Sequence, residues 1–171
     1  EAFVACLRYP PHGERSFGPT RVNFSAGAGY ASEAKDNICG FAMIETAEAV
    51  KNITEIVSSD GLDGGYIGPA DLTLGVTNGR LAPGFDRKES EMTEVIMKIL
   101  QAAKSAGIRA GIHCGSSTYA AKAISWGFDF ITLSNDVRIL VSGASEMVIE
   151  ARSLISGNEK VELPDKSSEV Y

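Results

Sequence analysis

The sequence predicts an α/β fold in which parallel strands alternate with helices. Three observations indicate this class: four short apolar runs are each followed by helical spacing, the connections are short except for one, and glycines end the helical segments. Alternating strands and helices form a parallel sheet with right-handed crossovers. Two architectures remain open, an open doubly wound sheet or part of a (β/α)8 barrel.

The segment before the first strand is less regular. Residues 1–7 read as a helix, which Pro10 and Pro11 end because proline cannot continue a helix. Residues 14–27 read as a loop rich in glycine and serine, and residues 31–37 as a short helix. No N-cap residue precedes the first helix, so we expect the chain to be a segment of a longer protein.

Four strand-and-helix units follow. The strands are expected at 38–44, 64–68, 108–113 and 128–133. The helices are expected at 49–57, 92–103, 119–124 and 137–155, with a long insertion at 76–85. Four strands are half a barrel, since a complete barrel has eight strands and about 250 residues. Such a half leaves two unpaired sheet edges and an uncovered apolar interior.

The amino-acid composition limits which classes of binding partner the protein can have. The chain has 171 residues, is 44% hydrophobic and carries a net charge of −6, which suits a single globular domain. The acidic balance argues against nucleic acid or an anionic membrane as a partner. No stretch of about 18 apolar residues is present to span a bilayer. Three cysteines with no motivating spacing fit a reduced, cytoplasmic setting.

Two carboxylates stand where strands end. Glu45 follows the first apolar run directly, and Asp71 holds the equivalent place one unit later. Neighbouring strands lie about 4.8 Å apart, so the two side chains could share one divalent cation. Two carboxylates leave coordination positions for water and a bidentate 2-oxo acid. The alternative is that both residues are helix N-terminal charges that stabilise the helix dipole.

Other strand ends carry weaker signals. Gly68 and Pro69 precede N–H groups that could bind a substrate carboxylate, although simple helix initiation also explains them. His113 and Cys114 invite a zinc or thiolate interpretation, but further soft ligands or an oriented base are missing. We therefore expect packing at the strand end. Residues 134–136 are expected to cap the last helix.

Three segments resemble the HpcH/HpaI family of metal-dependent (class II) pyruvate aldolases. They are Arg8-Tyr9-Pro10-Pro11, Ile44-Glu45-Thr46 and Tyr66-Ile67-Gly68-Pro69-Ala70-Asp71-Leu72. The resemblance extends to about Ile155, in order and with similar gaps. It implies a (β/α)8 TIM barrel, with residues 1–155 as its C-terminal half and residues 156–171 as a polar C-terminal tail.

The resemblance also implies an activity. Glu45 and Asp71 match the family's ligands for Mg²⁺, Mn²⁺ or Co²⁺, and the amides of Ala70 and Asp71 match the groups that hold the pyruvate carboxylate. The family's chemistry forms or cleaves 4-hydroxy-2-oxo acids through a pyruvate enolate and an aldehyde. Gly68 and Met43 are the other expected substrate-binding positions. A homo-oligomer is expected, a hexamer with a swapped last helix.

The chain departs from the family pattern. The catalytic His, its supporting Asp and the Arg of the family lie in a first half that has no counterpart here, so we expect no catalytic residue in this segment and no activity from it alone. Neither His12 nor His113 matches the family's base. The family's substrate-binding Gln falls on Met43, which cannot donate to an oxygen. Two alternatives stay open: an acyl-CoA lyase type of enzyme, and a non-catalytic half-barrel module.

Overall fold

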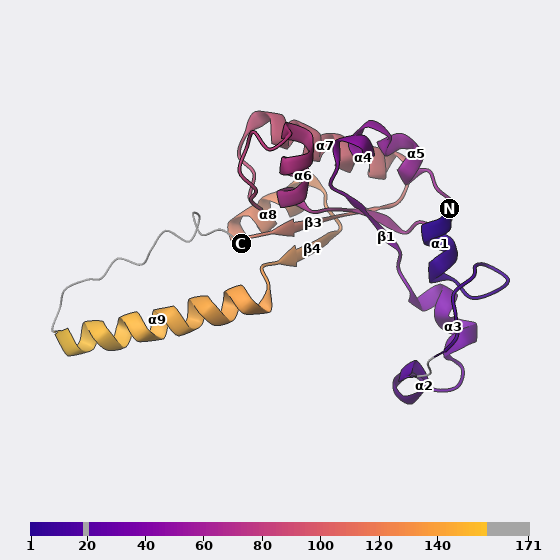
Figure 1. Ribbon diagram of the computed structural model, residues 1–171, viewed down its shortest axis with the longest axis horizontal. Coiled ribbons are helices and arrows are strands. Elements are labelled where there is room, and N and C mark those ends of the chain that lie inside the picture. The colour runs from indigo at the N-terminus through magenta and orange to yellow at the C-terminus, as the bar shows by residue number, and fades with distance from the viewer. Residues whose placement is uncertain (19–20, 157–171) are drawn as a thin grey trace.

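The core of the protein is a four-stranded parallel sheet. A computed structural model describes residues 1–18 and 21–156 (Figure 1). The strands are β1 (Phe41–Ile44), β2 (Gly64–Ile67), β3 (Arg109–Cys114) and β4 (Phe130–Leu133). All four expected strands are confirmed, and β1 begins three residues later than the apolar run. The expected polar tail lies outside the described residues from 157 onward.

Helices connect the strands and flank the sheet. They are α1 (Ala2–Leu7), α2 (Arg21–Ala26), α3 (Tyr30–Asn37), α4 (Ala47–Lys51), α5 (Ile53–Val57), α6 (Pro69–Thr77), α7 (Ser90–Ser105), α8 (Ser117–Trp126) and α9 (Asp136–Ser156). The helix expected at 49–57 is two helices, which meet at Asn52.

The prediction of a loop over residues 14–27 is wrong for residues 21–26, which form helix α2. This short helix buries no residue, so no apolar stripe marks it in the sequence. Gly27 has φ +80° and donates its N–H to Asn23 O at 3.1 Å, which is how glycine ends a helix. The glycine read as a loop signal is therefore a helix terminator.

The strand order decides between the two architectures. The order is β1-β2-β3-β4, with every neighbouring pair parallel. A doubly wound sheet reverses its order and has helices on both faces, whereas a barrel keeps sequence order and has helices outside. Here α4–α8 cover one face (Figure 1). The hydrophobic core lies between those helices and the sheet, around Ile44, Ile67, Ile112 and Met92.

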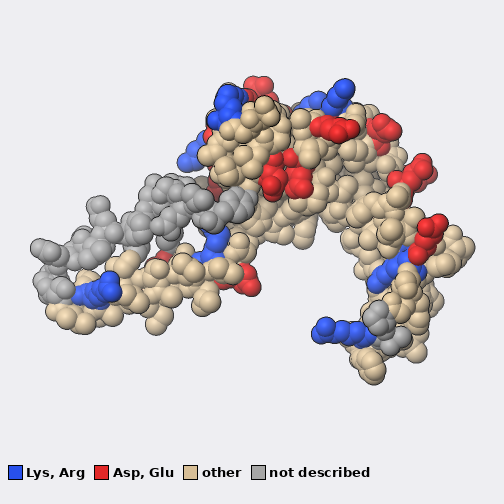
Figure 2. Space-filling model, viewed as in Figure 1, with Lys and Arg blue, Asp and Glu red and all other residues tan. Residues whose placement is uncertain are grey.

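Among residues 1–18 and 21–156, no layer of helices covers the opposite side of the sheet, here called the open face (Figure 1). Because side chains alternate along a strand, its residues are the neighbours of the core positions: Phe41, Met43, Tyr66, His113, Phe130 and Thr132. Met43 is 51% exposed and Phe130 46% exposed. Figure 2 shows the molecule hollowed beneath the sheet, between the two arms formed by α1–α3 and by α9. The sheet is thus uncovered where a complete barrel has its interior.

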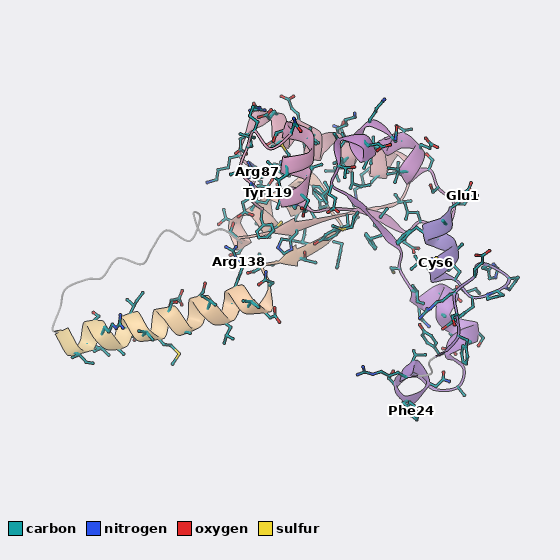
Figure 3. All side chains as sticks on the ribbon, in the orientation of Figure 1. Glu1, Cys6, Phe24, Arg87, Tyr119 and Arg138 are labelled. Carbon is teal, nitrogen blue, oxygen red and sulfur yellow. The ribbon has the colours of Figure 1, made fainter. Side chains whose placement is uncertain are left out.

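The two arms expose apolar side chains. Helix α9 projects away from the sheet (Figure 1) and exposes Leu140 and Met147, each by 72%. Phe24, 90% exposed, lies at the far end of the other arm (Figure 3). Among the described residues, no helix is both long and apolar enough to cross a membrane.

Two aspartates secure the amino ends of the strands. Asp63 Oδ2 accepts from Gly40 N at 2.6 Å and from Arg8 at 3.0 Å. Asp129 Oδ2 accepts from Ala110 N at 2.9 Å and from Lys104 at 2.6 Å, while Arg109 lies 3.4 Å from Oδ1. Each aspartate therefore ties two neighbouring strands together with backbone and cationic donors.

Candidate active site

The candidate residues lie at the carboxyl ends of the strands, along one edge of the sheet. Glu45 follows β1, Asp71 stands in the first turn of α6 after β2, and His113 and Cys114 end β3. Because the strands are parallel and in sequence order, these ends follow one another across the sheet.

Glu45 does not cap the helix that follows it. Thr46 is the N-cap of α4, and its hydroxyl accepts from Ala49 N at 3.0 Å. The acidic residue in the first turn of α4 is Glu48. The helix-dipole explanation therefore fits Glu48 better than Glu45, although it still fits Asp71, which is in the first turn of α6.

Two glycines let Glu45 lie against α6. A Cβ at Gly68 would be 3.0 Å from Glu45 Oε2 and 3.2 Å from Met43 Cε. A Cβ at Gly75 would be 2.9 Å from the backbone oxygen of Glu45. Side chains at these positions would occupy the space now taken by Glu45, so the carboxylate lies directly beside the start of α6.

The start of α6 offers backbone donors. The first backbone bond of the helix runs from Leu72 N to Gly68 O at 2.9 Å, which leaves the N–H groups of Ala70 and Asp71 outside the helical ladder. Pro69 at the first position supplies no N–H. Ala70 is 2% exposed, while the side chain of Asp71 is on the surface.

The two carboxylates lack protein partners. Within the part of the chain that the structure describes, neither Glu45 nor Asp71 makes a side-chain hydrogen bond or ion pair. Figure 2 shows acidic side chains gathered on the surface over α6. A carboxylate next to a hydrophobic core loses hydration, which costs free energy unless a cation or a hydrogen-bond donor compensates for it.

The donor set fits a divalent cation with open coordination positions. No group of three or more His, Cys, Asp or Glu side chains converges among residues 1–18 and 21–156. If a hard cation binds here, Glu45 and Asp71 could supply two carboxylate ligands, and its other positions would be left to water or substrate oxygens. Soft zinc chemistry is not supported, because Cys114 is fully buried and burial raises the pKa of its thiol to about 12.

Sequence reasoning missed a second group at this edge. Tyr66 and Thr132 hydrogen-bond through their hydroxyls, and Thr132 Oγ1 lies 2.8 Å from His113 Nδ1. The alternation of core residues on β2, β3 and β4 already places all three on the open face, and that was the available signal. Which of them touch depends on strand stagger, which a sequence does not show.

The long insertion between α6 and α7 lies over the end of β3. Asp86 Oδ1 accepts from Gly115 N at 2.7 Å, and the Phe85 ring packs edge-on against His113 with centroids 4.4 Å apart. Arg138, at the junction of β4 and α9 (Figure 3), lies 5.6 Å from the Phe85 ring centroid. The expected cap of α9 is confirmed, since Asn135 Oδ1 accepts from Arg138 N at 2.9 Å.

Known proteins are similar to this chain over most of its length. The family model described as HpcH/HpaI aldolase/citrate lyase matches residues 1–142. A hydroxypyruvate/pyruvate aldolase from Rhizorhabdus wittichii is 42% identical over 154 residues, which are 90% of this chain and 60% of that protein. A 4-hydroxy-2-oxovalerate aldolase from Novosphingobium aromaticivorans is 42% identical over 110 residues, 63% of this chain and 41% of that protein.

A solved structure shows the same architecture. A HpcH/HpaI aldolase/citrate lyase family protein from Burkholderia cenocepacia superposes with a TM-score of 0.74 at 27% identity, covering 88% of this chain and 59% of that one. The sheet described above is consistent with half of a (β/α)8 barrel. The chain spans about three fifths of the length of the first curated relative.

Proposed function

Since the chain belongs to the HpcH/HpaI aldolase/citrate lyase family, we propose that it forms part of a metal-dependent lyase that cleaves 4-hydroxy-2-oxo acids to pyruvate and an aldehyde, or runs the reverse addition. The observation that carries the proposal is the pair of unpartnered carboxylates at the strand ends, with Glu45 Oε2 lying beside Gly68 at the start of α6. The printed names of the relatives, which are aldolases, support it.

Glu45 and Asp71 are the proposed ligands of the cation, which is Mg²⁺, Mn²⁺ or Co²⁺. When bound there, such an ion acts as a Lewis acid on the ketone of a 2-oxo acid. Gly75 lets the backbone of Glu45 approach α6 closely, because a Cβ at Gly75 would lie 2.9 Å from the Glu45 backbone oxygen. Asp71 lies in the first turn of α6, the same turn whose backbone N–H groups are free to donate.

The start of α6 is the proposed anchor for the substrate carboxylate. The N–H groups of Ala70 and Asp71 can both donate to it, and the positive end of the helix dipole favours the anion. Gly68 keeps the approach free of a side chain. Met43, on the neighbouring strand, gives an apolar wall that cannot donate to the ketone oxygen.

We propose that proton transfer uses groups outside these 171 residues, because the chain spans about three fifths of the length of the first curated relative. Residues 1–155 are the proposed C-terminal half of the barrel. The exposed apolar side chains of α9 support a homo-oligomer in which this helix packs on a neighbouring subunit, as in a hexamer with a swapped last helix. The three unpaired cysteines agree with a cytoplasmic location.

Metal binding and product analysis of the full-length protein test the proposal. We expect metal-stripped protein to bind Mn²⁺ by electron paramagnetic resonance and to release pyruvate from a 4-hydroxy-2-oxo acid. Glu45→Gln or Asp71→Asn should lower kcat/KM about a thousandfold, because Lewis-acid polarisation contributes several kcal/mol. Glu48→Gln, in the first turn of α4, is the matched control.

Three results would count against the proposal. They are Mn²⁺ binding that survives both substitutions, a coenzyme A ester as the product in place of pyruvate, and no turnover by the full-length protein. The second result would favour the acyl-CoA lyase alternative, and the third the non-catalytic module.

A further inference from the structure

A small space at the start of α6 lies between a thioether and a carboxylate. A Cβ at Gly68 would be 3.2 Å from Met43 Cε and 3.0 Å from Glu45 Oε2. Side chains two residues apart on a strand face the same side of the sheet, as Met43 and Glu45 do. The methyl end of Met43 therefore lies beside a proposed cation ligand, in the space that Gly68 leaves open.

Met43 is accessible from the open face. Its side chain is 51% exposed, whereas Met92 is fully buried and Met97 packs against the hydrophobic core. Met147 is 72% exposed, but it is on α9, which projects away from the sheet (Figure 1). Among the four methionines of the chain, Met43 is thus the one that combines exposure with a place at the candidate site.

The same space borders the N–H groups that are proposed to hold the substrate carboxylate. Gly68 directly precedes α6, and the amides of Ala70 and Asp71 are outside its helical ladder. An acceptor oxygen added to this space would be repelled by the carboxylate of Glu45. It would be attracted by the N–H groups at the positive end of the helix dipole.

Oxidation of a methionine supplies such an oxygen. A thioether has no hydrogen to donate and is a weak acceptor. When hydrogen peroxide reacts with it, a sulfur lone pair attacks one peroxide oxygen and the O–O bond breaks. The hydroxide that leaves takes the proton of the transferred oxygen and becomes water, so sulfur is oxidised and peroxide is reduced. The sulfoxide product is polar and is reversible by reductases.

We propose that Met43 is an oxidation site that controls binding of the 2-oxo acid, because its sulfoxide oxygen competes with the substrate carboxylate for the N–H groups of Ala70 and Asp71. This inference rests on the proposed aldolase function. Oxidation leaves both carboxylates, Glu45 and Asp71, in place. Peroxide therefore weakens substrate binding without removing the cation.

Peroxide treatment of the full-length protein tests the inference. We expect peptide mass spectrometry to show one added oxygen on Met43, and KM for a 4-hydroxy-2-oxo acid to rise about tenfold while Mn²⁺ affinity is unchanged. A thiol added after the peroxide reverses sulfenic acids and disulfides, which removes any effect of exposed Cys6 and Cys39. Methionine sulfoxide reductases should then restore KM.

Substitution of each exposed methionine identifies the one responsible. Met43→Leu keeps an apolar side chain that peroxide does not oxidise, so its KM should be the same before and after treatment. Met147→Leu removes the other exposed thioether and is the matched control, which should keep the tenfold rise.

The outcomes separate the inference from the proposed function. A rise in KM that persists in Met43→Leu, a loss of Mn²⁺ affinity on oxidation, or an unmodified Met43 at a dose that oxidises Met147 would overturn the inference and leave the aldolase function standing. If the untreated full-length protein has no turnover, the aldolase function fails. Broadening of the pyruvate methyl NMR signal by protein-bound Mn²⁺ then tests the inference, and equal broadening before and after oxidation would overturn it.

Discussion

The acidic side chains at the two ends of the sheet differ in their hydrogen-bond and ion-pair partners. At the amino ends, Asp63 and Asp129 each accept a backbone N–H and a cationic side chain at 3.0 Å or less. At the carboxyl ends, Glu45 and Asp71 have no such partner among the described residues. A carboxylate with hydrogen-bond and ion-pair partners stabilises the fold, whereas a carboxylate without such partners is available to bind a ligand. This contrast supports the proposal that Glu45 and Asp71 bind a cation while Asp63 and Asp129 stabilise the fold.

The largest expected difference between the two ends is in the free energy of unfolding. Asp129→Ala leaves the N–H of buried Ala110 unpaired and removes two cationic contacts, so we expect a loss of about 3 kcal/mol. Glu45→Gln should change stability by less than about 0.5 kcal/mol. Urea unfolding of the full-length variants measures both, and Asp60→Ala, on an exposed loop, is the control.

The pH dependence of the Asp129 effect has a definite sign. Burial alone would raise its pKa, but the hydrogen bonds from Lys104 and from Ala110 N hold the pKa below its usual value. The stabilisation is therefore complete above about pH 4, the pKa of an unfolded aspartate, and is lost as the pH falls further. Equal losses from Asp129→Ala at pH 7 and pH 3 would contradict this account.

A second expected difference is the response to a cation. Mn²⁺ at a hundred times its dissociation constant should stabilise the wild-type protein by about 2.7 kcal/mol, because only the folded state has the site. The double variant Glu45→Gln with Asp71→Asn should lose this gain, while Asp60→Ala keeps it. Thermal unfolding with and without Mn²⁺ measures the effect. If the double variant keeps the gain, the cation binds elsewhere.

A smaller effect is expected at Gly68. In Gly68→Ala the new Cβ would lie 3.0 Å from Glu45 Oε2, so the carboxylate has to shift by a few tenths of an ångström. We expect Mn²⁺ affinity to fall about tenfold, since ligand placement is disturbed while both ligands remain. Gly143→Ala, where a Cβ meets no atom within 4 Å, is the matched control for calorimetric titration. Unchanged affinity in Gly68→Ala would separate Glu45 from the cation.

The smallest expected effect concerns His113. Burial lowers its pKa, nearby Asp86 opposes the shift, and Arg138 adds to it. Below about pH 6.5 the unfolded chain binds the proton more readily, so stability falls as the pH decreases from there. His113→Phe should flatten the dependence of Tm on pH between 7 and 5. His12→Gln should leave it unchanged, and a flat wild-type profile would contradict the prediction.

The sequence was informative where local patterns decide structure. Apolar runs located the four strands, and the residues that follow them located Glu45 and Asp71. Thr46 rather than Glu45 caps α4, which only the hydrogen bond to Ala49 reveals. The Tyr66–Thr132–His113 chain was missed because it joins three strands, and its contacts depend on strand stagger and on the space over Gly111. Short α2 was missed because it buries nothing.

The same pair of hydrogen bonds, here called an aspartate joint, connects neighbouring strands at two places along the amino ends of the sheet. Asp63 exchanges two bonds with Gly40, at 3.0 and 2.6 Å, and Asp129 exchanges two with Ala110, both at 2.9 Å. Each aspartate follows a buried apolar residue, Leu62 or Phe128, and a glycine with positive φ. The sheet thus repeats one two-strand unit, and a chimera that exchanges β3 and β4 with those of a related protein can keep both aspartate joints, provided that it retains the bond of 3.0 Å from Arg109 N to Asp63 O between the two units.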